Sequence, residues 1–538
     1  MASLREIKGM LKIDYLFGCL LFALFLTGNS YAADADKEIR KTEKWELFEI
    51  ILNGPILGNP FEDVRLRAVF SHEKTSVEVE GFCDGDGVYK IRFMPEFNGK
   101  WSYKTSSNKV ELNGKDGKFE VFSPASNNHG PVRVKNKFHF AYADGKPFKP
   151  FGTTCYAWNH QSERLMNVTL ETLAKSPFNK IRMCVFPKYY EFNREDPELF
   201  PFEGNRGNFD LSKFNVKYFQ RLDRCIIELK KIGVEADLIL FHPYDKGRWG
   251  FDRMNRMQDE RYLRYVVSRY SAFRNIWWSV ANEFDYMEKK NQADWDAYLG
   301  LIKKHDPYAK LCSIHNGSVL FDHTNPILSH ASIQNGSAVE DFGRAGLLRD
   351  AYQKPVIYDE VKYEGNITQR WGKISAQEMV HRFWQGVMAG TYVTHGETIH
   401  SADQVLWWSK GGVLRGQSPE RIGFLRKVLE DGPEEGINLI DPWQVPEISG
   451  KSGEYYLVYF GKKIERKWEL VLPKVKVSKE FSVSVEILDT WNMTQEMVAP
   501  RVKIEPRGRY ELAPKEKFFI DLPGKPYLAL RIRKIAGQ

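Results

Sequence analysis

The sequence predicts an α/β protein in which a (β/α)8 TIM barrel is flanked by N-terminal and C-terminal β-sandwich domains. Three observations support this fold class. Short runs of alternating apolar and polar residues occupy the first part of the chain, and they return at its end. Between them, apolar strand-like runs alternate with amphipathic helical stretches. At 538 residues the chain is also too long for one compact core, so several domains are expected.

The N-terminus, residues 1–32, is predicted to be a secretory signal peptide. Basic residues between Arg5 and Lys12 precede an apolar run over 15–26, and small residues up to Ala32 form a cleavage site. The apolar run is too short to span a membrane comfortably. We therefore expect a secreted or periplasmic protein with no membrane span in its mature form. Attachment to the cell surface and an uncleaved anchor remain as alternatives.

The segment 39–125 is predicted to form the N-terminal β-sandwich. Residues 64–70 and 76–80 alternate apolar and polar side chains, and a glycine-rich turn follows at 84–87. Short strands separated by such turns are typical of a small sandwich. The stretch 123–131, which is rich in Ser, Asn and Pro, is predicted to be the linker to the next domain.

The segment 131–445 is predicted to form the barrel. Eight apolar runs follow one another here, and most are joined by helical patterns, which favours a closed parallel barrel. An open doubly wound sheet is the rival fold, but no GxGxxG phosphate loop in the sequence supports it. The predicted strands cover residues 151–155, 179–186, 236–242, 275–283, 311–316, 327–332, 354–360 and 390–397.

The last segment, 450–538, returns to the β pattern and is predicted to form the C-terminal β-sandwich. Strand patterns occur at 455–460, 468–472, 481–487 and 527–532.

Composition disfavours several classes of function. The net charge of +8 comes from 78 basic and 70 acidic residues spread evenly along the chain, so nucleic-acid binding is not expected. The six cysteines are scattered without a CxxC motif, which argues against a zinc ribbon or a disulfide framework. No cofactor and no metal are expected. The aromatic share of 14% suits carbohydrate binding because ring faces pack against sugars, although most rings are expected in the core.

Two glutamates are the predicted catalytic residues. The active site of a TIM barrel lies at the C-terminal ends of its strands, and Glu283 and Glu360 end the fourth and seventh apolar runs. Glycoside hydrolysis needs two carboxyl groups across such a barrel mouth. One donates a proton to the leaving oxygen, and the other attacks the anomeric carbon or activates water. A buried salt bridge, for example with Arg182, is the alternative for either glutamate.

Substrate-binding residues are predicted from the same strand-end rule and from aromatic rings that could stack on a sugar. A carbohydrate is the expected partner, and the histidines are expected to bind its hydroxyl groups. Lys188, after the second run, also meets the strand-end rule. The predicted binding set is Asn282, Arg182, Trp158, His242, Asp245, His315, Asn316, Gln334, His395, Glu397 and Trp407, with Trp249 and Trp408 as further candidate sugar platforms.

The residues around the two glutamates resemble those of a known clan. Asn282-Glu283 after the run 277–281, together with Glu360 after 355–359, resembles the retaining glycoside hydrolases with catalytic glutamates on strands four and seven. More narrowly, the whole chain resembles bacterial proteins with a DUF5060-type N-terminal domain, a DUF4038-like, apiosidase-related barrel and a DUF5605-type C-terminal domain. The N-terminal match rests on residues 59–61, 81–85, 92–95 and 99–101.

The resemblance implies a role for each residue at the centre of the site. Glu283 would be the acid/base and Glu360 the nucleophile of a retaining reaction. Asn282 would bind the sugar hydroxyl next to the reacting carbon, and the Arg182 guanidinium would keep Glu360 ionised. The resemblance also favours plant-type polysaccharides or oligosaccharides, with pectic side chains as a narrower guess.

Some assignments stay open. The clan often places a tyrosine or histidine from strand six beside the nucleophile, and this chain offers His330 or Gln334 there instead. Glu364 and Glu397 compete with Glu360 as the nucleophile because they lie near the same strand ends.

Two other functions are weighed against hydrolysis by two glutamates. Histidines at several strand ends are compatible with a metal-dependent barrel hydrolase, although such sites usually begin with a close histidine pair on strand one and His160 stands alone. A carbohydrate-binding protein with a degenerate barrel would also carry two β domains, but both glutamates are present. Insertions at 189–208 and 243–257 favour a closed pocket and the release of terminal sugars. The oligomeric state is not predicted.

Overall fold

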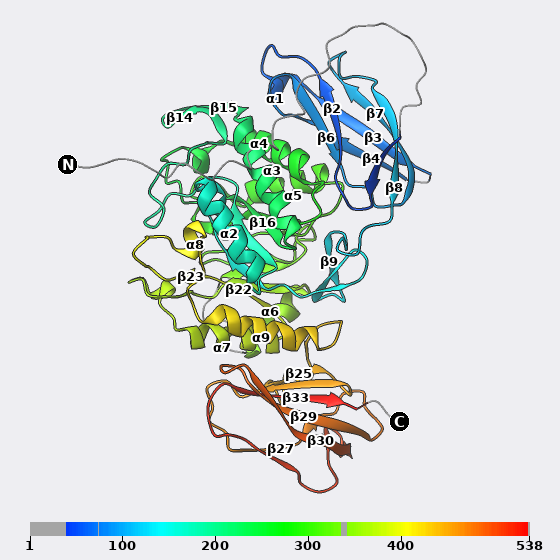
Figure 1. Cartoon of the computed structure of the whole chain (residues 1–538), viewed down its shortest axis with the longest axis vertical. Helices are drawn as coiled ribbons and strands as arrows, with labels where there is room; N and C mark the ends of the chain where they lie inside the picture. The colour runs from blue at the N-terminus through cyan, green and yellow to red at the C-terminus, as the bar shows by residue number, and fades with distance from the viewer. Residues whose placement is uncertain (1–38, 74, 335–341, 536–538) are drawn as a thin grey trace, which may run out of the picture. The chain divides into compact units, whose positions relative to one another are not determined.

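The computed structural model describes residues 39–73, 75–334 and 342–535 (Figure 1). The predicted signal peptide and its cleavage site at Ala32 lie outside the described residues. Within these ranges, none of the helices combines the length and the apolar character that crossing a membrane demands. The predicted fold class is confirmed, because a barrel of eight parallel strands is preceded and followed in the chain by β-rich regions.

The N-terminal region consists of two sheets that share one apolar core. Alternation places Leu66, Ala68 and Phe70 on the buried face of one strand while the residues between them stay exposed. The Phe70 ring stacks on Phe93 at 4.0 Å. The first sheet has the order β1 (Arg40–Glu43), β8 (Asp116–Phe122), β7 (Gly99–Ser107), β3 (Leu66–His72) and β4 (Thr75–Glu80), and the second has the order β2 (Phe48–Asn53), β6 (Val88–Phe93) and β5 (Phe82–Cys83), with helix α1 (Pro60–Asp63) between β2 and β3 in the chain.

A buried ion cluster joins this region to the barrel. Arg92 of β6 donates hydrogen bonds of 2.7 and 3.1 Å to the two carboxylate oxygens of Asp223. Arg269 donates to the same two oxygens at 2.7 and 2.9 Å, and it also lies 2.7 Å from Asp84. Because each of these charges is buried, the cluster depends on all its members.

A small antiparallel sheet closes the N-terminal end of the barrel. It contains β9 (Val132–Lys135), β10 (His139–Tyr142) and β11 (Pro147–Phe148). Phe140 and Phe148 pack against Trp277, which lies near the start of a barrel strand. This sheet therefore plugs the end of the barrel opposite to the strand ends that carry the glutamates.

The barrel contains all eight predicted strands, joined in parallel. Neighbouring strands pair in the order β18, β17, β16, β13, β12, β22, β20 and β19, and a parallel bridge between His315 and Ser332 closes the ring between the fifth and sixth strands. In chain order the strands are β12 (Gly152–Thr154), β13 (Lys180–Cys184), β16 (Glu235–Phe241), β17 (Ile276–Ala281), β18 (Cys312–Ser313), β19 (Ala331–Gln334), β20 (Val356–Glu360) and β22 (Tyr392–His395).

The sixth strand is shifted from its predicted range. It begins at Ala331, because the apolar pair Ile327 and Leu328 lies in a turn. The side chain of Asn325 accepts a hydrogen bond from the Ile327 amide at 3.0 Å and holds this turn. A short apolar run alone did not distinguish the turn from a strand.

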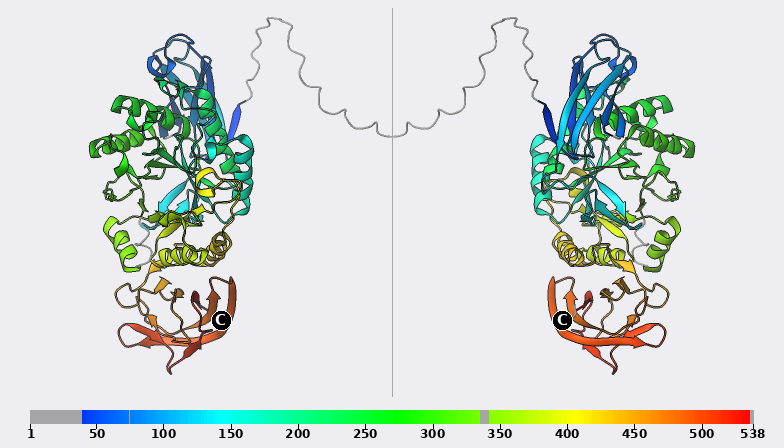
Figure 2. Two further views of the ribbon diagram at one scale, coloured as in Figure 1. Left: turned by 90° about the vertical axis from the view of Figure 1, so that its left-hand side faces the viewer. Right: turned by 90° about the vertical axis from the view of Figure 1, so that its right-hand side faces the viewer.

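Helices cover the outside of the barrel strands, as Figure 2 shows from two opposite sides. Several begin at the side-chain caps that sequence preferences lead one to expect, such as Ser162, Asn255, Asn291 and Ser375. The helices are α2 (Glu163–Lys175), α3 (Val216–Lys231), α4 (Arg256–Tyr270), α5 (Gln292–His305), α6 (Phe342–Tyr352), α7 (Ala376–Met388), α8 (Trp407–Lys410) and α9 (Ser418–Glu430). A hairpin of β14 (Phe202–Asn205) and β15 (Asn208–Phe214) lies within the insertion before α3.

The barrel interior contains charges as well as apolar side chains. Lys180 donates hydrogen bonds to Asp237 at 2.8 Å and to Asp359 at 2.9 Å, and all three are buried. Arg182 Nε lies 3.8 Å from the same Asp359 oxygen. The cluster contacts Arg182, which also lies beside Glu360 at the strand end.

The C-terminal region is again built of β-strands, drawn in orange to red in Figure 1. Its main sheet has the order β24 (Asn438–Leu439), β25 (Ile448–Lys451), β26 (Tyr455–Tyr459), β33 (Leu528–Lys534), β29 (Phe481–Asp489), β30 (Thr494–Arg507), β31 (Glu511–Ala513) and β28 (Leu472–Pro473), and β27 (Lys467–Glu469) pairs with β32 (Phe519–Asp521). Apolar residues of these strands form a separate core.

Candidate active site

The two predicted catalytic glutamates lie at the C-terminal ends of barrel strands. Glu360 is the last residue of β20, and Glu283 follows β17 by two residues. Glu283 is 5% exposed and Glu360 is 8% exposed. A carboxyl group buried to this extent needs partners or a proton, because an isolated buried charge is very costly.

Glu360 is surrounded by hydrogen-bond donors and positive charge. The Tyr156 hydroxyl donates to its Oε1, and the same oxygen lies 3.5 Å from Arg182 Nη1 and 3.5 Å from His315 Nε2. Burial raises the pKa of Glu360, but the hydrogen bond and charge of His315 and the charge of Arg182 outweigh burial, so that the pKa lies below its ordinary value. Glu360 is therefore held as a carboxylate, the form that a nucleophile needs.

Glu283 has the opposite environment. Burial raises the pKa of Glu283 above its ordinary value and the charge of Glu360 raises it further, while Lys188 offsets only part of the effect. Its Oε2 accepts hydrogen bonds from the Tyr244 hydroxyl and, at 3.2 Å, from Nδ2 of Asn282. A carboxyl group that keeps its proton near neutral pH is suited to general acid catalysis.

Glu283 also has an unusual backbone. Its φ of 52° and ψ of 54° lie in the left-handed region, which residues other than glycine rarely adopt. This conformation turns the chain from β17 into a short 3-10 helix, η3 (Phe284–Tyr286), and the Phe284 amide donates to the His315 carbonyl at 3.0 Å. Such strain costs about 1–2 kcal/mol and is found mainly at functional positions.

Buried polar side chains link the two glutamates. Asn282 accepts a hydrogen bond from Arg182 Nη2 at 2.8 Å, and the Tyr156 hydroxyl oxygen lies 3.3 Å from the same Asn282 oxygen. Its amide nitrogen donates to Glu283, while Arg182 and Tyr156 both reach Glu360. The predicted set of Glu283, Glu360, Asn282 and Arg182 is therefore brought together.

His315, Gln334 and Asn316 form a second group beside the glutamates. His315 Nδ1 lies 3.0 Å from the Ser332 hydroxyl, and its Nε2 lies 3.2 Å from Gln334 Oε1. The Gln334 side chain in turn lowers the pKa of Glu283. Asn316 contacts only the backbone of this group, accepting from the Gln334 amide at 3.0 Å and donating to its carbonyl at 3.1 Å. Asn316 therefore holds Gln334 in place.

The structure places His330 outside the site. It precedes β19 and packs against Phe140 and Trp277 at the closed end of the barrel. His315 and Tyr156 are instead the side chains beside Glu360, from strands five and one. The histidine sought near the nucleophile thus comes from a different strand.

Two tyrosines were missed by sequence reasoning. Tyr156 lies two residues after β12, and Tyr244 lies three residues after β16. Both positions satisfy the strand-end rule, which was applied mainly to charged residues and amides. The signal in the sequence was a tyrosine just after each strand. The sequence does not show that these side chains point toward the glutamates.

The loop after β16 contains two of the predicted binding residues. His242 Nδ1 accepts the Tyr244 amide at 3.2 Å, and its Nε2 lies 3.2 Å from the Phe186 carbonyl. Burial lowers the pKa of His242 to about 4, so the ring is neutral and fixes Tyr244. Asp245 accepts the Phe251 amide at 2.6 Å and shapes its own loop. Within the described part of the chain, none of its hydrogen bonds reaches the glutamates.

The predicted sugar platforms Trp158 and Trp407 are both fully buried. Trp158 belongs to the main core, and Trp407 Nε1 donates to the Thr153 hydroxyl at 2.8 Å. Neither ring has a face available for a sugar. Trp408, which lies 5.5 Å from the Tyr156 ring, is nearer to the glutamates, whereas Trp249 packs on Phe251.

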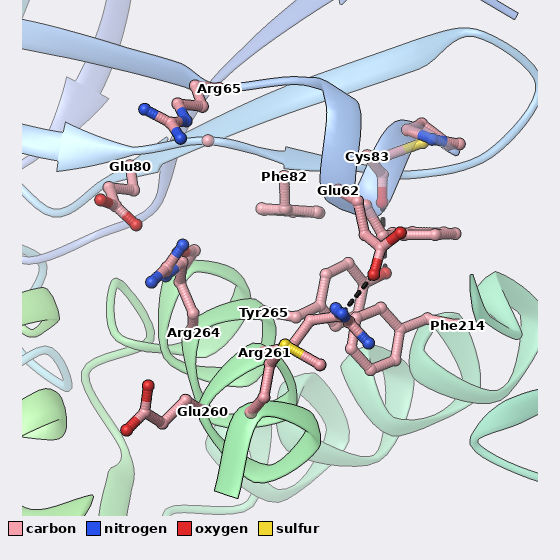
Figure 3. Close-up of a pocket in the computed structure, with 15 residues that line it drawn as sticks. Glu62, Arg65, Glu80, Phe82, Cys83, Phe214, Glu260, Arg261, Arg264 and Tyr265 are labelled. Carbon is pink, nitrogen blue, oxygen red and sulfur yellow. Dashed lines mark hydrogen bonds and ion pairs between the residues drawn. The ribbon is translucent and has the colours of Figure 1, made fainter. Parts of the chain in front are cut away.

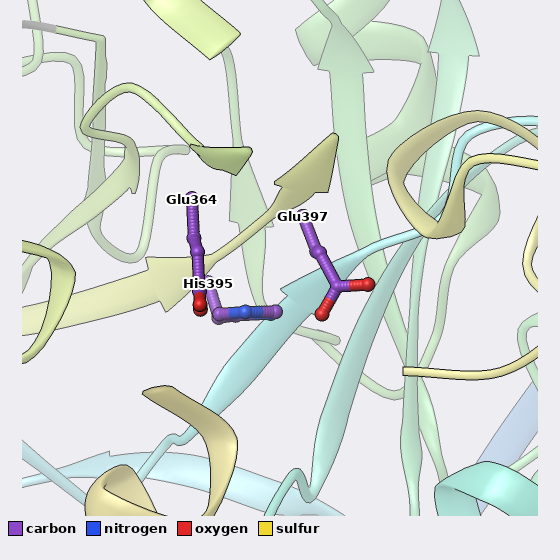
Figure 4. Close-up of side chains that lie close together, drawn as sticks. All are labelled: Glu364, His395 and Glu397. Atoms are coloured by element: carbon purple, nitrogen blue, oxygen red, sulfur yellow. The ribbon is translucent and has the colours of Figure 1, made fainter. Parts of the chain in front are cut away.

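A second acidic cluster lies at the end of β22, where Glu364, His395 and Glu397 meet (Figure 4). Each offers a possible ligand atom within 4.8 Å of the others. The carboxylates, however, already accept backbone N–H groups of residues 415–418: Glu397 from Arg415 at 2.9 Å and Gly416 at 2.6 Å, and Glu364 from Gln417 at 2.8 Å and Ser418 at 3.1 Å. The pair anchors this loop and caps the start of α9.

Glu364 and Glu397, the two other candidates for the nucleophile, both belong to this cluster. Burial raises the pKa of Glu397 to about 7, despite the two backbone donors. Burial likewise lowers the pKa of His395 to about 3, and its Nδ1 lies 3.1 Å from the Thr153 hydroxyl. The carboxylates of Glu364 and Glu397 thus bind the backbone of the loop at residues 415–418 and do not contact the pair of Glu283 and Glu360 in these hydrogen bonds.

A cavity of about 320 Å³ lies elsewhere, between the N-terminal β region and α4 (Figure 3). In it Arg261 pairs with Glu62, and aromatic rings form one wall. None of the predicted site residues lines it. Its main lining residues are Phe61, Glu62, Arg65, Glu80, Phe82, Phe214, Glu260, Arg261, Arg264 and Tyr265.

Comparisons with known proteins give three family matches along the chain. Residues 41–108 match the domain of unknown function DUF5060, residues 134–413 match the apiosidase-like catalytic domain, and residues 443–533 match the domain of unknown function DUF5605. A comparison with curated proteins finds no match.

Solved structures extend these matches. A candidate glycoside hydrolase from Bacteroides vulgatus ATCC 8482 is 40% identical, with a TM-score of 0.89 over 92% of this chain and 100% of the other. A glycoside hydrolase family 5 protein from the same organism is 15% identical, with a TM-score of 0.54 over 77% of this chain and 95% of the other. The second likeness concerns the fold alone.

Proposed function

The chain belongs to the apiosidase-like family and is a glycoside hydrolase; from this premise we propose that it cleaves O-glycosidic bonds by a retaining double displacement. Glu360 is the nucleophile and Glu283 is the acid/base. The observation that carries the proposal is that two neighbouring buried carboxyl groups have pKa values moved in opposite directions. Environments that separate two titrating groups in this way assign the acid and the base.

In the first step, the Glu360 carboxylate attacks the anomeric carbon. The bond from that carbon to the leaving oxygen breaks, and the leaving oxygen takes the proton of Glu283. The enzyme is left with a glycosyl ester on Glu360 and a carboxylate at Glu283. Hydrogen bonds from Tyr244 and Asn282 stabilise that new negative charge.

In the second step, water attacks the anomeric carbon and Glu283 takes its proton. The ester bond breaks, Glu360 returns to its carboxylate form, and the sugar leaves with its original anomeric configuration. Arg182 and Tyr156 stabilise the departing carboxylate because both contact Glu360 Oε1. Asn282 lies between the glutamates, where its amide can bind the hydroxyl group next to the reacting carbon.

A retaining mechanism requires carboxyl groups about 5 Å apart. Supporting this spacing, Tyr156 donates its one hydroxyl proton to Glu360, its oxygen lies 3.3 Å from Asn282 Oδ1, and Asn282 donates to Glu283. Two side chains thus join the carboxyl groups, and the charge of Glu360 acts directly on Glu283.

We further propose plant-type polysaccharides or oligosaccharides, with pectic side chains foremost, as substrates of a secreted or periplasmic enzyme. The division into domains at 39–125, 131–445 and 450–538 is part of the same proposal. The family match of the barrel and the β-rich character of both flanking regions support it.

The test is the configuration of the first product. The purified protein is incubated with aryl glycosides and pectic oligosaccharides, and the released anomer is followed by proton NMR before it mutarotates. We expect the wild type to release a product of retained configuration. We expect Glu283→Ala and Glu360→Ala to lose turnover. Glu430→Ala is the control, because it removes an exposed carboxyl group whose one ion pair among the described residues is with Arg426. Inversion of configuration, or full activity in either active-site variant, overturns the proposal.

A further inference from the structure

Lys188 is a buried lysine with an unusual set of neighbours. It follows β13 and is 1% exposed, and among the described residues its ammonium group makes neither a hydrogen bond nor an ion pair. Its ammonium group lies instead over aromatic rings. The distances from Nζ to the ring centroids are 3.5 Å for Tyr156, 4.0 Å for Tyr244, 4.6 Å for Tyr190 and 5.0 Å for Trp408.

This arrangement has no simple role in stability. Burying an ammonium group without a paired carboxylate is unfavourable, and cation–π contacts compensate only in part. An apolar side chain of the same length would fill the same space without that cost. The charge at this position therefore needs a functional explanation.

The two nearest rings belong to the two tyrosines that contact the glutamates. The Tyr156 hydroxyl donates to Glu360, and the Tyr244 hydroxyl donates to Glu283. A cation over the face of a phenol holds the ring and polarises its O–H bond, which makes the hydroxyl a stronger donor. One ammonium group thus acts on the hydrogen bonds of both carboxyl groups.

We propose that Lys188 is a positioning residue, which holds Tyr156 and Tyr244 so that each donates its hydroxyl proton to one glutamate of the catalytic pair. This inference rests on the proposed function, because it takes Glu283 and Glu360 as that pair. It adds a residue whose action passes through the two phenols.

The location of the charge suits both steps of the reaction. In the resting site the negative charge is on Glu360, and after the first step it is on Glu283. The charge of Lys188 interacts with both carboxyl groups, and its two nearest phenols donate to them, so the same cation favours whichever glutamate is ionised. Arg182 contacts Glu360 directly. Its charge also lowers the pKa of Glu283, but the charge of Lys188 lowers it more, so Lys188 makes the larger contribution in the second state.

The groups that face Lys188 determine its effect on pH dependence. Its positive charge opposes the rise in the pKa of Glu283. Removing that charge therefore raises the pKa of Glu283 further and moves the alkaline limb of the activity profile to higher pH. The charged and titratable groups around Lys188 are Tyr156, Tyr190, Tyr244, Cys184, Arg182, Glu283 and Glu360.

The experiment compares Lys188→Met, which keeps the length and removes the charge, with Lys188→Arg, which keeps the charge. We expect kcat of the Met variant to fall by about tenfold or more with little change in KM, and its alkaline limb to move upward. The Arg variant is expected to keep the alkaline limb of the wild type. Lys310→Met is the matched control, because Lys310 is also buried near a tyrosine but lies outside the site, and its pH profile should not change.

The double variant Lys188→Met/Tyr244→Phe tests the proposed route of action. If part of the effect of Lys188 passes through the Tyr244 phenol, the double variant loses less activity than the two single losses predict together, because only the route through Tyr156 remains for Lys188 to act on. A wild-type kcat and pH profile in Lys188→Met, or fully additive losses in the double variant, overturn the inference. If Lys188→Met does not fold, Lys188→Gln is measured in its place. These outcomes differ from a failure of the proposed function, which would show as activity in Glu283→Ala or Glu360→Ala.

Discussion

The Arg182 side chain donates a 2.8 Å hydrogen bond from Nη2 to the side-chain oxygen of Asn282. A guanidinium group has only donors, so this contact leaves the Asn282 amide a single orientation. Its oxygen faces Arg182, and its nitrogen faces Glu283 Oε2 at 3.2 Å. The acid/base therefore receives a donor whose direction is set by the residue that also contacts the nucleophile.

Asn282→Asp tests this orientation with almost no change in shape. The substitution replaces the donor beside Glu283 with a carboxylate oxygen, so the two acidic groups repel and a transition-state hydrogen bond to the sugar is lost. We expect kcat/KM to fall on the order of a hundredfold, with the fold intact by circular dichroism. A variant with wild-type kcat/KM would show that the Asn282 amide has no part in catalysis.

Glu283→Ala should affect substrates unequally. A substrate with a good leaving group needs no proton in the first step, so its first step survives, whereas a poor leaving group loses about 10²–10⁴-fold. Added azide should then restore turnover and give a glycosyl azide of retained configuration. Glu360→Ala is the comparison, because it should be inactive on both substrates. Equal losses in Glu283→Ala for good and poor leaving groups would contradict the assignment of the acid.

The pH profile of kcat/KM should be bell-shaped and wide. Activity requires Glu360 ionised and Glu283 protonated. The pKa of Glu360 is lowered, so the acid limb lies below the ordinary glutamate pKa of 4.5, and the pKa of Glu283 is raised, so the alkaline limb lies above it. The profile is measured on a glycoside with a poor leaving group, whose first step needs the Glu283 proton, and on an aryl glycoside with a good leaving group, on which the alkaline limb should be much weaker. A limb that persists unchanged on the good leaving group would assign it to another group.

Chelation should leave the activity unchanged. The acidic cluster of Glu364, His395 and Glu397 could bind a cation, but its carboxylates already accept the backbone amides of residues 415–418. The protein is dialysed against EDTA and assayed on an aryl glycoside, with and without added divalent ions. Loss of activity that a divalent ion restores would favour the metal-dependent alternative.

Asp223→Ala should destabilise the protein strongly. The substitution leaves Arg92 and Arg269 buried without the carboxylate that both contact, which costs about 3–5 kcal/mol. Chemical denaturation followed by fluorescence measures the loss. Glu430→Ala is the control, since its exposed pair with Arg426 contributes at most about 1 kcal/mol. A similar small effect in both variants would show that the buried cluster does not stabilise the fold.

The barrel and its glutamates could be predicted because the relevant pattern is local. An apolar run that ends in an acidic residue shows both the strand and the place where it reaches the rim, as at Glu360. Where the run is short, the pattern fails: Ile327 and Leu328 form a turn because Asn325 caps it. Neighbouring polar residues decided that case.

The directions of side chains were beyond prediction. Trp158 and Trp407 have the right type and position for sugar platforms, yet their rings complete the core. Tyr156 and Tyr244 became partners of the glutamates because their loops turn toward the rim. The joint anchoring of residues 415–418 by Glu364 and Glu397 likewise depends on loops far apart in the chain. Single-residue rules do not contain that information.

The backbone of Glu283 is left-handed, a conformation that other residues adopt at lower cost. Selection for stability alone would therefore favour another residue at the acid/base position. Glycine or asparagine fits that conformation better, so an inactive Glu283→Gly descendant would be expected to gain thermal stability while it loses catalysis. Relatives that have lost hydrolytic activity would then be expected to carry glycine or asparagine at the position of Glu283. The identity of the residue at this position would then distinguish catalytically active from inactive proteins of the same fold.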